Sequence, residues 1–327
     1  MTVLIITHSE DNESPELVAE AVKRRGERAV RFDTDRYPTE VRLSARIDEG
    51  GESLTLVTDR GALDLGEVTA LWHRRVSVGK LIPQTLDPQL RSASVGEARA
   101  SLFGVLASLR AFRVDPVHLI RRAENKQLQL QAAREFGLEV PRTLTSNDPD
   151  AVRRFADSCP GGLISKMLSS FAVYDEGREM VVFTNPVTEK DLQDLSGLSL
   201  CPMTFQERVE KRLELRVTVV GRRVMAASID SQASDRAQHD WRRDGLRMID
   251  DWQHYQLPSE VEAKLLRLMD YFQLNYGAAD FILTPEGRHV FLEVNPSGEF
   301  FWLEQRPGLP VSEALADVLL GLAPRRE

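Results

Sequence analysis

The sequence predicts an α/β protein in which strands alternate with helices. Residues 3–7 form a short apolar run that is typical of a buried strand. Ser14 followed by Pro15 then predicts a helix start, because serine is a common cap and proline favours the first helical position. In residues 290–295 an aliphatic side chain occupies every second position, the period of a strand with one buried face. At 327 residues the chain is long enough for two or three subdomains.

Residues 1–120 are expected to form an N-terminal domain of this α/β type. After the first strand and helix we expect strands at 29–32, 42–47, 54–58 and 69–73, and a long helix at 88–112. The strands 42–47 and 54–58 form a predicted hairpin. No Gly-x-Gly-x-x-Gly and no Walker-type phosphate loop occurs in the sequence, so neither a dinucleotide site nor a P-loop is indicated.

Residues 121–204 are expected to form a small central subdomain. A helix from Glu124 to Phe136 ends at Gly137, which is a common helix terminator, and Pro141 keeps the next segment extended. Further along we expect a short strand at 162–166, a hairpin at 173–184 and a helix at 188–195.

Residues 205–327 are expected to form a C-terminal subdomain dominated by strands. Ser259 and Glu262 have the spacing of a capping box, which predicts that a helix begins with Ser259 as its cap. The apolar face of this helix is predicted to comprise Val261, Leu265, Leu268 and Phe272. Residues 324–327 are interpreted as a frayed tail.

Three oxygen-bearing side chains are predicted to share one face of the hairpin that follows. Glu293 and Asn295 lie two residues apart on the second strand, and the first strand carries Asp280. A four-residue turn would place Thr284 opposite His289 and Asp280 opposite Glu293. Carboxylate and amide oxygens are the ligands that Mg²⁺ accepts, usually together with phosphate oxygens. The alternative for these residues alone is a surface hairpin with a polar face.

Two lysines are candidates for binding phosphate. Lys126 lies in the first turn of its helix, where unpaired N–H groups and the helix dipole favour an anion. Lys166 ends an apolar strand, and a lysine facing a cleft from that position needs a partner such as phosphate. Taken alone, Lys126 is more often a surface lysine.

In this order the elements of residues 120–305 resemble the ATP-grasp superfamily. The resemblance implies that Lys126 and Lys166 hold the phosphates of ATP. A hinge at Glu207 and Val209 would frame the adenine, mostly through backbone groups. Glu214, seven residues after Glu207, would take the ribose.

The same resemblance implies that Asp280, Glu293 and Asn295 carry two Mg²⁺ ions. It also implies that residues 1–120 are a pre-ATP-grasp domain and that 121–204 are the lid over the nucleotide. After Lys166 the sequence departs from the superfamily, because a serine pair, Ser169 and Ser170, stands where most members have a glycine-rich loop.

A closer resemblance lies in phrases that most ATP-grasp enzymes lack. They are Leu71-Trp-His-Arg-Arg75, Val140-Pro-Arg-Thr-Leu-Thr-Ser-Asn147, Ile229-Asp-Ser-Gln232, Asp240-Trp-Arg-Arg243 and Asn295-Pro-Ser-Gly-Glu-Phe-Phe-Trp-Leu-Glu304. In these phrases the chain is similar to the graspetide (microviridin-type) peptide macrocyclases. Such enzymes join acidic side chains of a ribosomal precursor peptide to Thr or Ser hydroxyls or to Lys amines.

Three residues are candidates for binding or orienting the reacting groups of the substrate and ATP. Strand alternation places Arg216 on the same face as Glu214, where a guanidinium can grip a substrate carboxylate or the γ-phosphate. The alternative for Arg216 is an ion pair with an acid of the metal site. Arg242 is a second candidate for the transferring phosphate, and Asp230 could orient an arginine or the incoming hydroxyl.

Leader recognition is expected on the lid, following the family resemblance. Asp191 and Asp194 lie three residues apart in the predicted helix 188–195 and could bind a basic residue of the leader. The alternative is a solvated helix face.

The activity that the resemblance implies is ATP-dependent macrocyclisation through acyl phosphates. We expect ω-ester bonds to Thr or Ser, because residues 230–247 are too polar to lower the pKa of a substrate lysine. The alternatives are a RimK-like ligase that forms amide bonds with glutamate, and a catalytically silent ATP- or peptide-binding module.

Composition limits the partners and the compartment. The net charge of −8 argues against a nucleic-acid binder, and no apolar run approaches the length of a membrane span. The N-terminus lacks a signal peptide, and two cysteines make no disulfide framework, which favours the cytoplasm. A homodimer is a further expectation from the family.

Overall fold

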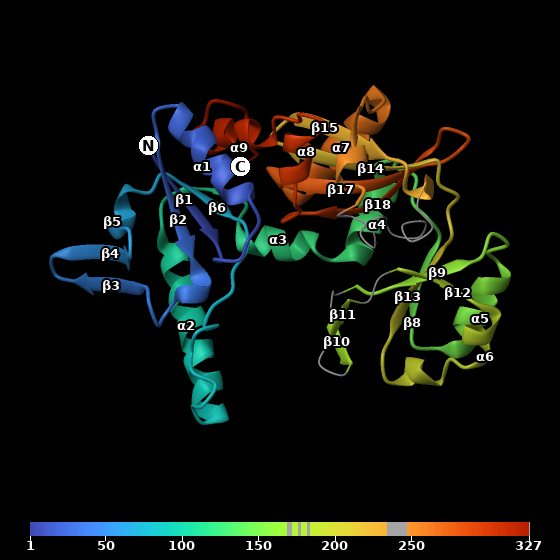
Figure 1. The fold of residues 1–327 in the computed structure, drawn as a ribbon, viewed down its shortest axis with the longest axis horizontal. Helices are drawn as coiled ribbons and strands as arrows, with labels where there is room; N and C mark the ends of the chain where they lie inside the picture. Colours follow the sequence, from blue (N-terminus) through green and yellow to red (C-terminus); the bar gives the residue numbers. More distant parts are fainter. Residues whose placement is uncertain (169–171, 176–177, 182–183, 234–246, 327) are drawn as a thin grey trace.

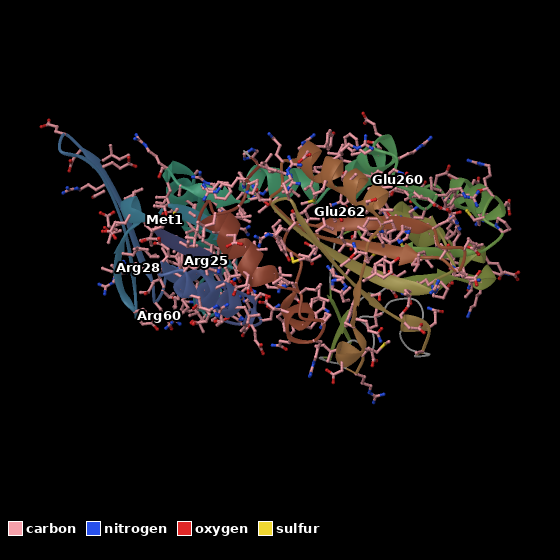
Figure 2. The ribbon with its side chains drawn as sticks, turned by 90° about the horizontal axis from the view of Figure 1, so that it is seen from above. Met1, Arg25, Arg28, Arg60, Glu260 and Glu262 are labelled. Atoms are coloured by element: carbon pink, nitrogen blue, oxygen red, sulfur yellow. The ribbon has the colours of Figure 1, made fainter. Side chains whose placement is uncertain are left out.

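The computed structural model describes residues 1–168, 172–175, 178–181, 184–233 and 247–326. Within these residues the chain forms three units: the N-terminal unit at the left of Figure 1, the C-terminal unit at the upper right and the central unit below it. In Figure 2, Met1, Arg25, Arg28 and Arg60 lie in the N-terminal unit, whereas Glu260 and Glu262 lie on the C-terminal unit.

The N-terminal unit contains a parallel sheet with the strand order β2-β1-β6-β7. Its strands are β1 (Thr2–Thr7), β2 (Arg28–Asp33), β6 (Ala70–His73) and β7 (Phe112–Val114), and its helices are α1 (Ser14–Arg24) and α2 (Pro88–Ser108). Both faces of β1 are buried, as the apolar run predicted. Val3 and Ile5 pack with α1 and the C-terminal helix α9 (Val311–Leu319), whereas Leu4 and Ile6 pack with α2.

A second, antiparallel sheet projects from this unit beside α2 (Figure 1). It consists of β3 (Arg42–Asp48), β4 (Gly51–Thr58) and β5 (Gly61–Asp64). The predicted hairpin is therefore confirmed as β3–β4, and β5 is a strand that the sequence pattern did not predict.

The helices α3 (Val117–Ala123) and α4 (Lys126–Glu135) lead from the first unit toward the other two (Figure 1). The central unit has an antiparallel sheet with the order β12-β9-β13-β8. Its elements are β8 (Thr143–Ser146), α5 (Pro149–Asp157), β9 (Leu163–Lys166), β12 (Asn185–Val187), α6 (Glu189–Gln193) and β13 (Met203–Glu207). A separate hairpin, β10 (Ala172–Asp175) and β11 (Arg178–Val181), confirms the prediction for residues 173–184. The expected domain boundary between residues 204 and 205 falls inside β13, whose pairing places it in the central sheet.

The C-terminal unit is built on an antiparallel sheet with the order β16-β15-β14-β17-β18. Its elements are β14 (Leu213–Val220), β15 (Arg223–Ile229), β16 (Gln253–Tyr255), α7 (Ser259–Phe272), β17 (Tyr276–Leu283), β18 (His289–Asn295), α8 (Phe301–Gln305) and α9. One face packs on α4 and α7, where Leu265, Leu268 and Phe272 confirm the predicted apolar stripe. This dry face supports the strands from behind and leaves the opposite face for polar chemistry.

Two predicted helices begin or end at other residues than expected. The long helix stops at Ser108, because Phe112 belongs to β7 and pairs beside β6. The helix predicted from Glu124 starts at Lys126, since Asn125 caps it and accepts a hydrogen bond from Leu128 N at 2.9 Å. The residues before it form α3, which was not predicted.

Two predicted caps also differ. The N-cap of α1 is Glu13, so Ser14 is already helical, and the N-cap of α7 is Pro258. Ser259 is therefore the first helical residue and its expected capping box is absent from this helix. In each case the cap lies one residue before the predicted serine, a shift that leaves the apolar faces unchanged.

Candidate active site

The predicted metal ligands come together on neighbouring strands of the C-terminal sheet. On β14 and β17, Arg216 lies opposite Asp280, and on β17 and β18, Asp280 lies opposite Glu293. Glu214 lies two residues before Arg216 and therefore faces the same side of the sheet. One face of three adjacent strands thus carries Glu214, Arg216, Asp280 and Glu293.

The pairing reaches this arrangement through a β-bulge that the sequence did not predict. Asp280 opposes Glu293 as expected, but the register shifts beyond it, so that Phe281 opposes Phe291. The prediction that Thr284 faces His289 is wrong, because Leu283 faces His289. The extra residue is Leu292, which breaks the simple alternation: Phe291 and Val294 share the core behind the sheet.

Each of the two carboxylates has a cationic partner. Lys126 Nζ lies 2.8 Å from Glu293 Oε2, and Arg216 Nε lies 3.1 Å from Asp280 Oδ1. The side chains of Asp280 and Glu293 are 13% and 25% exposed, so both acids are largely withdrawn from water. Lys126 thus lies beside a predicted metal ligand, and its binding of phosphate stays a prediction. Arg216 makes the ion pair that was its alternative interpretation. The Arg216 guanidinium also lies 5.7 Å from the ring centre of Trp302.

Asn295 ends β18 and begins the turn that closes the site. Its Oδ1 accepts a hydrogen bond from Ser297 N at 3.0 Å. The turn then folds back over β17, because a Cβ on Gly298 would lie 2.4 Å from Ala278 Cβ and 3.4 Å from Arg216 Nη1. A glycine is therefore required where this turn approaches the sheet.

The nucleotide candidates lie on two different units. Lys166 ends β9 opposite Thr204 of the central sheet. Glu207 ends β13, and the half-buried Val209 lies in the segment that leads from β13 to β14. Glu214 pairs with Lys211 through an Oε1–Nζ contact of 2.9 Å. The loop with Ser169 and Ser170 lies outside the described residues.

Glu207 is held by the central unit. Its carboxylate accepts hydrogen bonds from Arg142 N at 2.9 Å and Arg142 Nε at 2.8 Å. Partial burial by itself would raise the pKa of Glu207, but these two donors outweigh it and hold the pKa below its ordinary value. These bonds hold the Glu207 side chain against Arg142 at the start of the central unit's sheet.

Of the remaining candidates, Asp230 is exposed directly after β15 and accepts a hydrogen bond from Gln232 N at 3.0 Å. Arg242 lies outside the described residues.

The two leader-binding candidates cap their own loop. Asp191 accepts from Thr188 N at 2.8 Å in a capping box that starts α6. Asp194 lies beyond α6 and accepts from Ser196 N at 3.1 Å, so the prediction that both aspartates share one helix is wrong. The helix ends early because Asp194 turns the chain into the next segment.

A charged cluster contacts the turn after Asn295, and the sequence did not predict it. Arg74 and Asp11 have fully buried side chains that approach to 3.4 Å, and Arg74 donates to the carbonyl oxygen of Ser297 in the turn after Asn295. Arg75 pairs with Glu299 at 2.7 Å. The phrase Leu71–Arg75 contains both arginines, but the sequence does not predict that Arg74 contacts Ser297, 223 residues further along the chain.

Comparison with known proteins assigns the family. Residues 2–121 match the family model of the MvdD pre-ATP grasp domain. The macrocyclase MdnC from Microcystis aeruginosa MRC, solved with its precursor peptide MdnA, is 48% identical; the match covers 98% of this chain and 100% of that chain, with a TM-score of 0.89. This chain belongs to the graspetide macrocyclases. It therefore has the ATP-grasp fold and is an ATP-dependent ligase of the peptide-cyclising class.

A second relative of this macrocyclase is a RiPP-associated ATP-grasp ligase from Chryseobacterium gregarium, solved with ADP and with a leader and core peptide. It is 40% identical over 100% of this chain and 98% of that chain, with a TM-score of 0.95. A RimK domain ATP-grasp protein from Sphaerobacter thermophilus DSM 20745 is 16% identical over 98% of this chain and 100% of that chain, with a TM-score of 0.57, a likeness of fold alone. No curated protein matches the sequence. Among the described residues of the macrocyclase, no helix is long and apolar enough to cross a membrane.

Proposed function

We propose that this macrocyclase activates Asp or Glu side chains of a ribosomal precursor peptide and joins them to Thr or Ser hydroxyls as ω-esters. The observation that carries the proposal is the pair Asp280 and Glu293, held in register on adjacent strands with a cation beside each. Support for the substrate class comes from MdnC, which was solved with a precursor peptide and matches the chain throughout.

ATP is the proposed energy source, supported by the ADP in the Chryseobacterium ligase. Lys126 begins a helix whose first N–H groups favour an anion, so its ammonium and those N–H groups suit the phosphates. Lys166 would approach the phosphates from the central unit. Glu214 would accept hydrogen bonds from the ribose, and the backbone near Val209 would contact adenine.

The residues fit Mg²⁺ as the companion of ATP. The largely buried carboxylates of Asp280 and Glu293 lie opposite each other on β17 and β18. Asn295 adds an amide oxygen at the end of β18. Oxygen donors of this kind suit Mg²⁺, and two ions would bind between Asp280, Glu293, Asn295 and the phosphates. Bound there, Mg²⁺ would neutralise charge that develops on the phosphates.

The chemistry needs no covalent enzyme intermediate. A substrate carboxylate oxygen attacks the γ-phosphorus, the bond to the β-phosphate oxygen breaks, and ADP leaves. A peptide hydroxyl then attacks the acyl carbon, inorganic phosphate leaves, and an ester closes the ring. Arg216 pairs with Asp280 in the structure and would turn to the substrate carboxylate once Mg²⁺ occupies Asp280. Asp230 and Arg242 would orient the hydroxyl and the transferring phosphate. The enzyme contributes positioning, charge stabilisation and the exclusion of water from the acyl phosphate.

The leader would dock on the central unit near α6. Asp191 and Asp194 are both exposed there, and their carboxylates suit a basic leader residue. We propose a homodimer from the family resemblance and a cytoplasmic location from the N-terminus and the low cysteine content. Light scattering of the purified enzyme tests the dimer.

One experiment tests the whole proposal. The enzyme, ATP, Mg²⁺ and the precursor peptide encoded nearest to its gene should yield ADP, phosphate and a peptide that is lighter by one water for each ring. Mild base should hydrolyse an ester and restore the mass. A base-resistant ring at lysine would overturn the ester assignment, and AMP with pyrophosphate would overturn the acyl-phosphate route.

A further inference from the structure

Gln129 is a fully buried amide that contacts the metal-ligand strand directly. It lies on α4 one turn after Lys126, and its side chain is closed off from solvent. Its Nε2 donates to Val294 O at 2.8 Å and also to Ala123 O, and its Oε1 accepts from Val294 N at 2.9 Å. One side chain therefore satisfies both backbone groups of Val294.

Val294 lies between two proposed metal ligands, Glu293 and Asn295, on a strand at the edge of its sheet. The outward N–H and C=O groups of an edge strand need partners when they are buried. The amide of Gln129 supplies a donor and an acceptor there, as the peptide group of a further strand would.

A second backbone contact lies on the other side of the bulge. Phe291 N donates to Glu139 O at 2.8 Å, just after α4. The bulged residue Leu292 and the ligand Glu293 are thus flanked by two fixed points, at residues 291 and 294. Because a bulge otherwise allows the strand to change register and direction, these points determine where the Glu293 carboxylate lies.

The same helix also contacts the ligand itself. Lys126 and Gln129 are three residues apart and share one face of α4; the first pairs with the Glu293 carboxylate and the second with the adjoining backbone. We propose that Gln129 is a positioning residue that fixes the bulged strand so that Asp280, Glu293 and Asn295 form one metal site. This inference rests on the proposed magnesium site.

The variants Gln129→Met and Gln129→Glu test the proposal. Methionine keeps the volume and removes all three hydrogen bonds, whereas glutamate keeps one acceptor and loses both donors. Gln127→Met is the matched control, because Gln127 lies on the same helix and is exposed. Hydrogen–deuterium exchange of peptides that cover residues 289–295 reports the strand, and thermal unfolding reports the fold.

Metal binding is measured with Mn²⁺ as the probe, by electron paramagnetic resonance in the presence of ADP, together with ADP affinity without metal. Both Gln129 variants should bind Mn²⁺ about 10- to 100-fold more weakly. ADP affinity without metal should be unchanged, and exchange should rise at 289–295 but not in α7. Gln127→Met should match the parent in every measurement.

Normal Mn²⁺ affinity in a folded Gln129 variant would overturn the positioning role. Loss of folding in both Gln129 variants would also overturn it, in favour of a purely structural role. Glu293→Gln in the same assay distinguishes a failure of the proposed metal site from a failure of the role of Gln129. If that variant also binds Mn²⁺ normally, the proposed metal site itself fails; if it loses Mn²⁺ while the Gln129 variants do not, only the role of Gln129 fails.

Discussion

At the scale of single residues, Lys126 and Arg216 compensate the negative charges that Mg²⁺ would otherwise neutralise. Leaving Asp280 or Glu293 uncompensated in a largely buried place would be unfavourable. In the described structure Lys126 and Arg216 supply that compensation. If Mg²⁺ and ATP bind as proposed, Lys126 changes partner from the Glu293 carboxylate to a phosphate, which couples metal binding to nucleotide binding.

This exchange predicts opposite effects of Lys126→Met on two ligands. Glu293 loses its 2.8 Å partner, so Mn²⁺ in the absence of nucleotide should bind more tightly to the variant than to the parent. ATP should bind more weakly, by about tenfold or more, because a charge-assisted contact is lost. Calorimetry with each ligand separately measures both. A parallel loss of both affinities would show that Lys126 merely supports the site.

His73 predicts a pH dependence of stability. It is buried at the end of β6, and neither ring nitrogen has a hydrogen-bond partner among the described residues. Burial, with a smaller contribution from the positive Arg113, lowers the pKa of His73 from 6.5 to about 4. The unfolded chain therefore binds the proton more tightly, so this contribution to stability is present above pH 6.5 and is lost as the pH falls toward 4.

A shift of this size corresponds to about 3 kcal/mol in the free energy of unfolding between those limits. In His73→Phe the dependence of denaturant stability on pH should flatten across this window. The exposed His254 provides a matched control in His254→Phe, which should keep the slope of the parent. An unchanged slope in His73→Phe would contradict the assignment.

At the scale of elements, the sequence predicted most strands and the apolar faces because these depend on local periodicity. The pairing of Asp280 with Glu293 was predictable for that reason. The bulge was not, because its fixed points, Glu139 O and the Gln129 amide, lie far from it in the sequence, in α4 and the segment that follows α4. The serine at 259 shows a similar limit: its spacing fits a cap, but Pro258 is the N-cap and Ser259 is already helical.

The turn after β18 predicts a sharp requirement for glycine. Gly298→Ala should push the turn away from Ala278, since the added Cβ would lie only 2.4 Å from the alanine Cβ. A displacement of about 1 Å can lower a rate about 10²-fold, so cyclisation should nearly stop. Gly96→Ala, in α2 with open space around it, should stabilise the protein by about 0.5–1 kcal/mol. Product formation and thermal unfolding are measured for both. Equal activity in the two variants would mean that the turn tolerates movement.

At the scale of the whole molecule, contacts between distant segments hold the units together. Arg25 at the end of α1 lies 2.6 Å from Glu313 and from Asp317 of α9, while Arg74 reaches the turn at Ser297. Periodicity predicts none of these contacts, because each joins residues more than 220 positions apart. The prediction of a frayed tail at 324–327 fails for the same reason at Arg326, which is buried.

Arg326 joins three segments that meet at one end of the strands β14 and β17. Its Nε lies 2.6 Å from Asp270 Oδ1 in α7, its Nη1 donates to the carbonyl oxygens of Gly221 and Leu274, and its backbone N–H donates to Asn275 Oδ1 at 2.7 Å. Asn275 in turn donates to Asp115, at the end of the N-terminal unit. The tail thus connects the first and last units through buried polar groups.

Arg326→Gln should therefore lower the free energy of unfolding by about 3 kcal/mol, because buried carbonyls and Asp270 lose a charged donor. Arg222→Gln is a matched control: Arg222 pairs with the other oxygen of Asp270 at 2.8 Å, but its side chain is 52% exposed. That variant should lose at most about 1 kcal/mol. Urea unfolding of the two variants measures the difference, and limited proteolysis shows whether the first unit loosens in Arg326→Gln. Equal losses in both variants would mean that the tail contributes a surface ion pair and not a connection between the units.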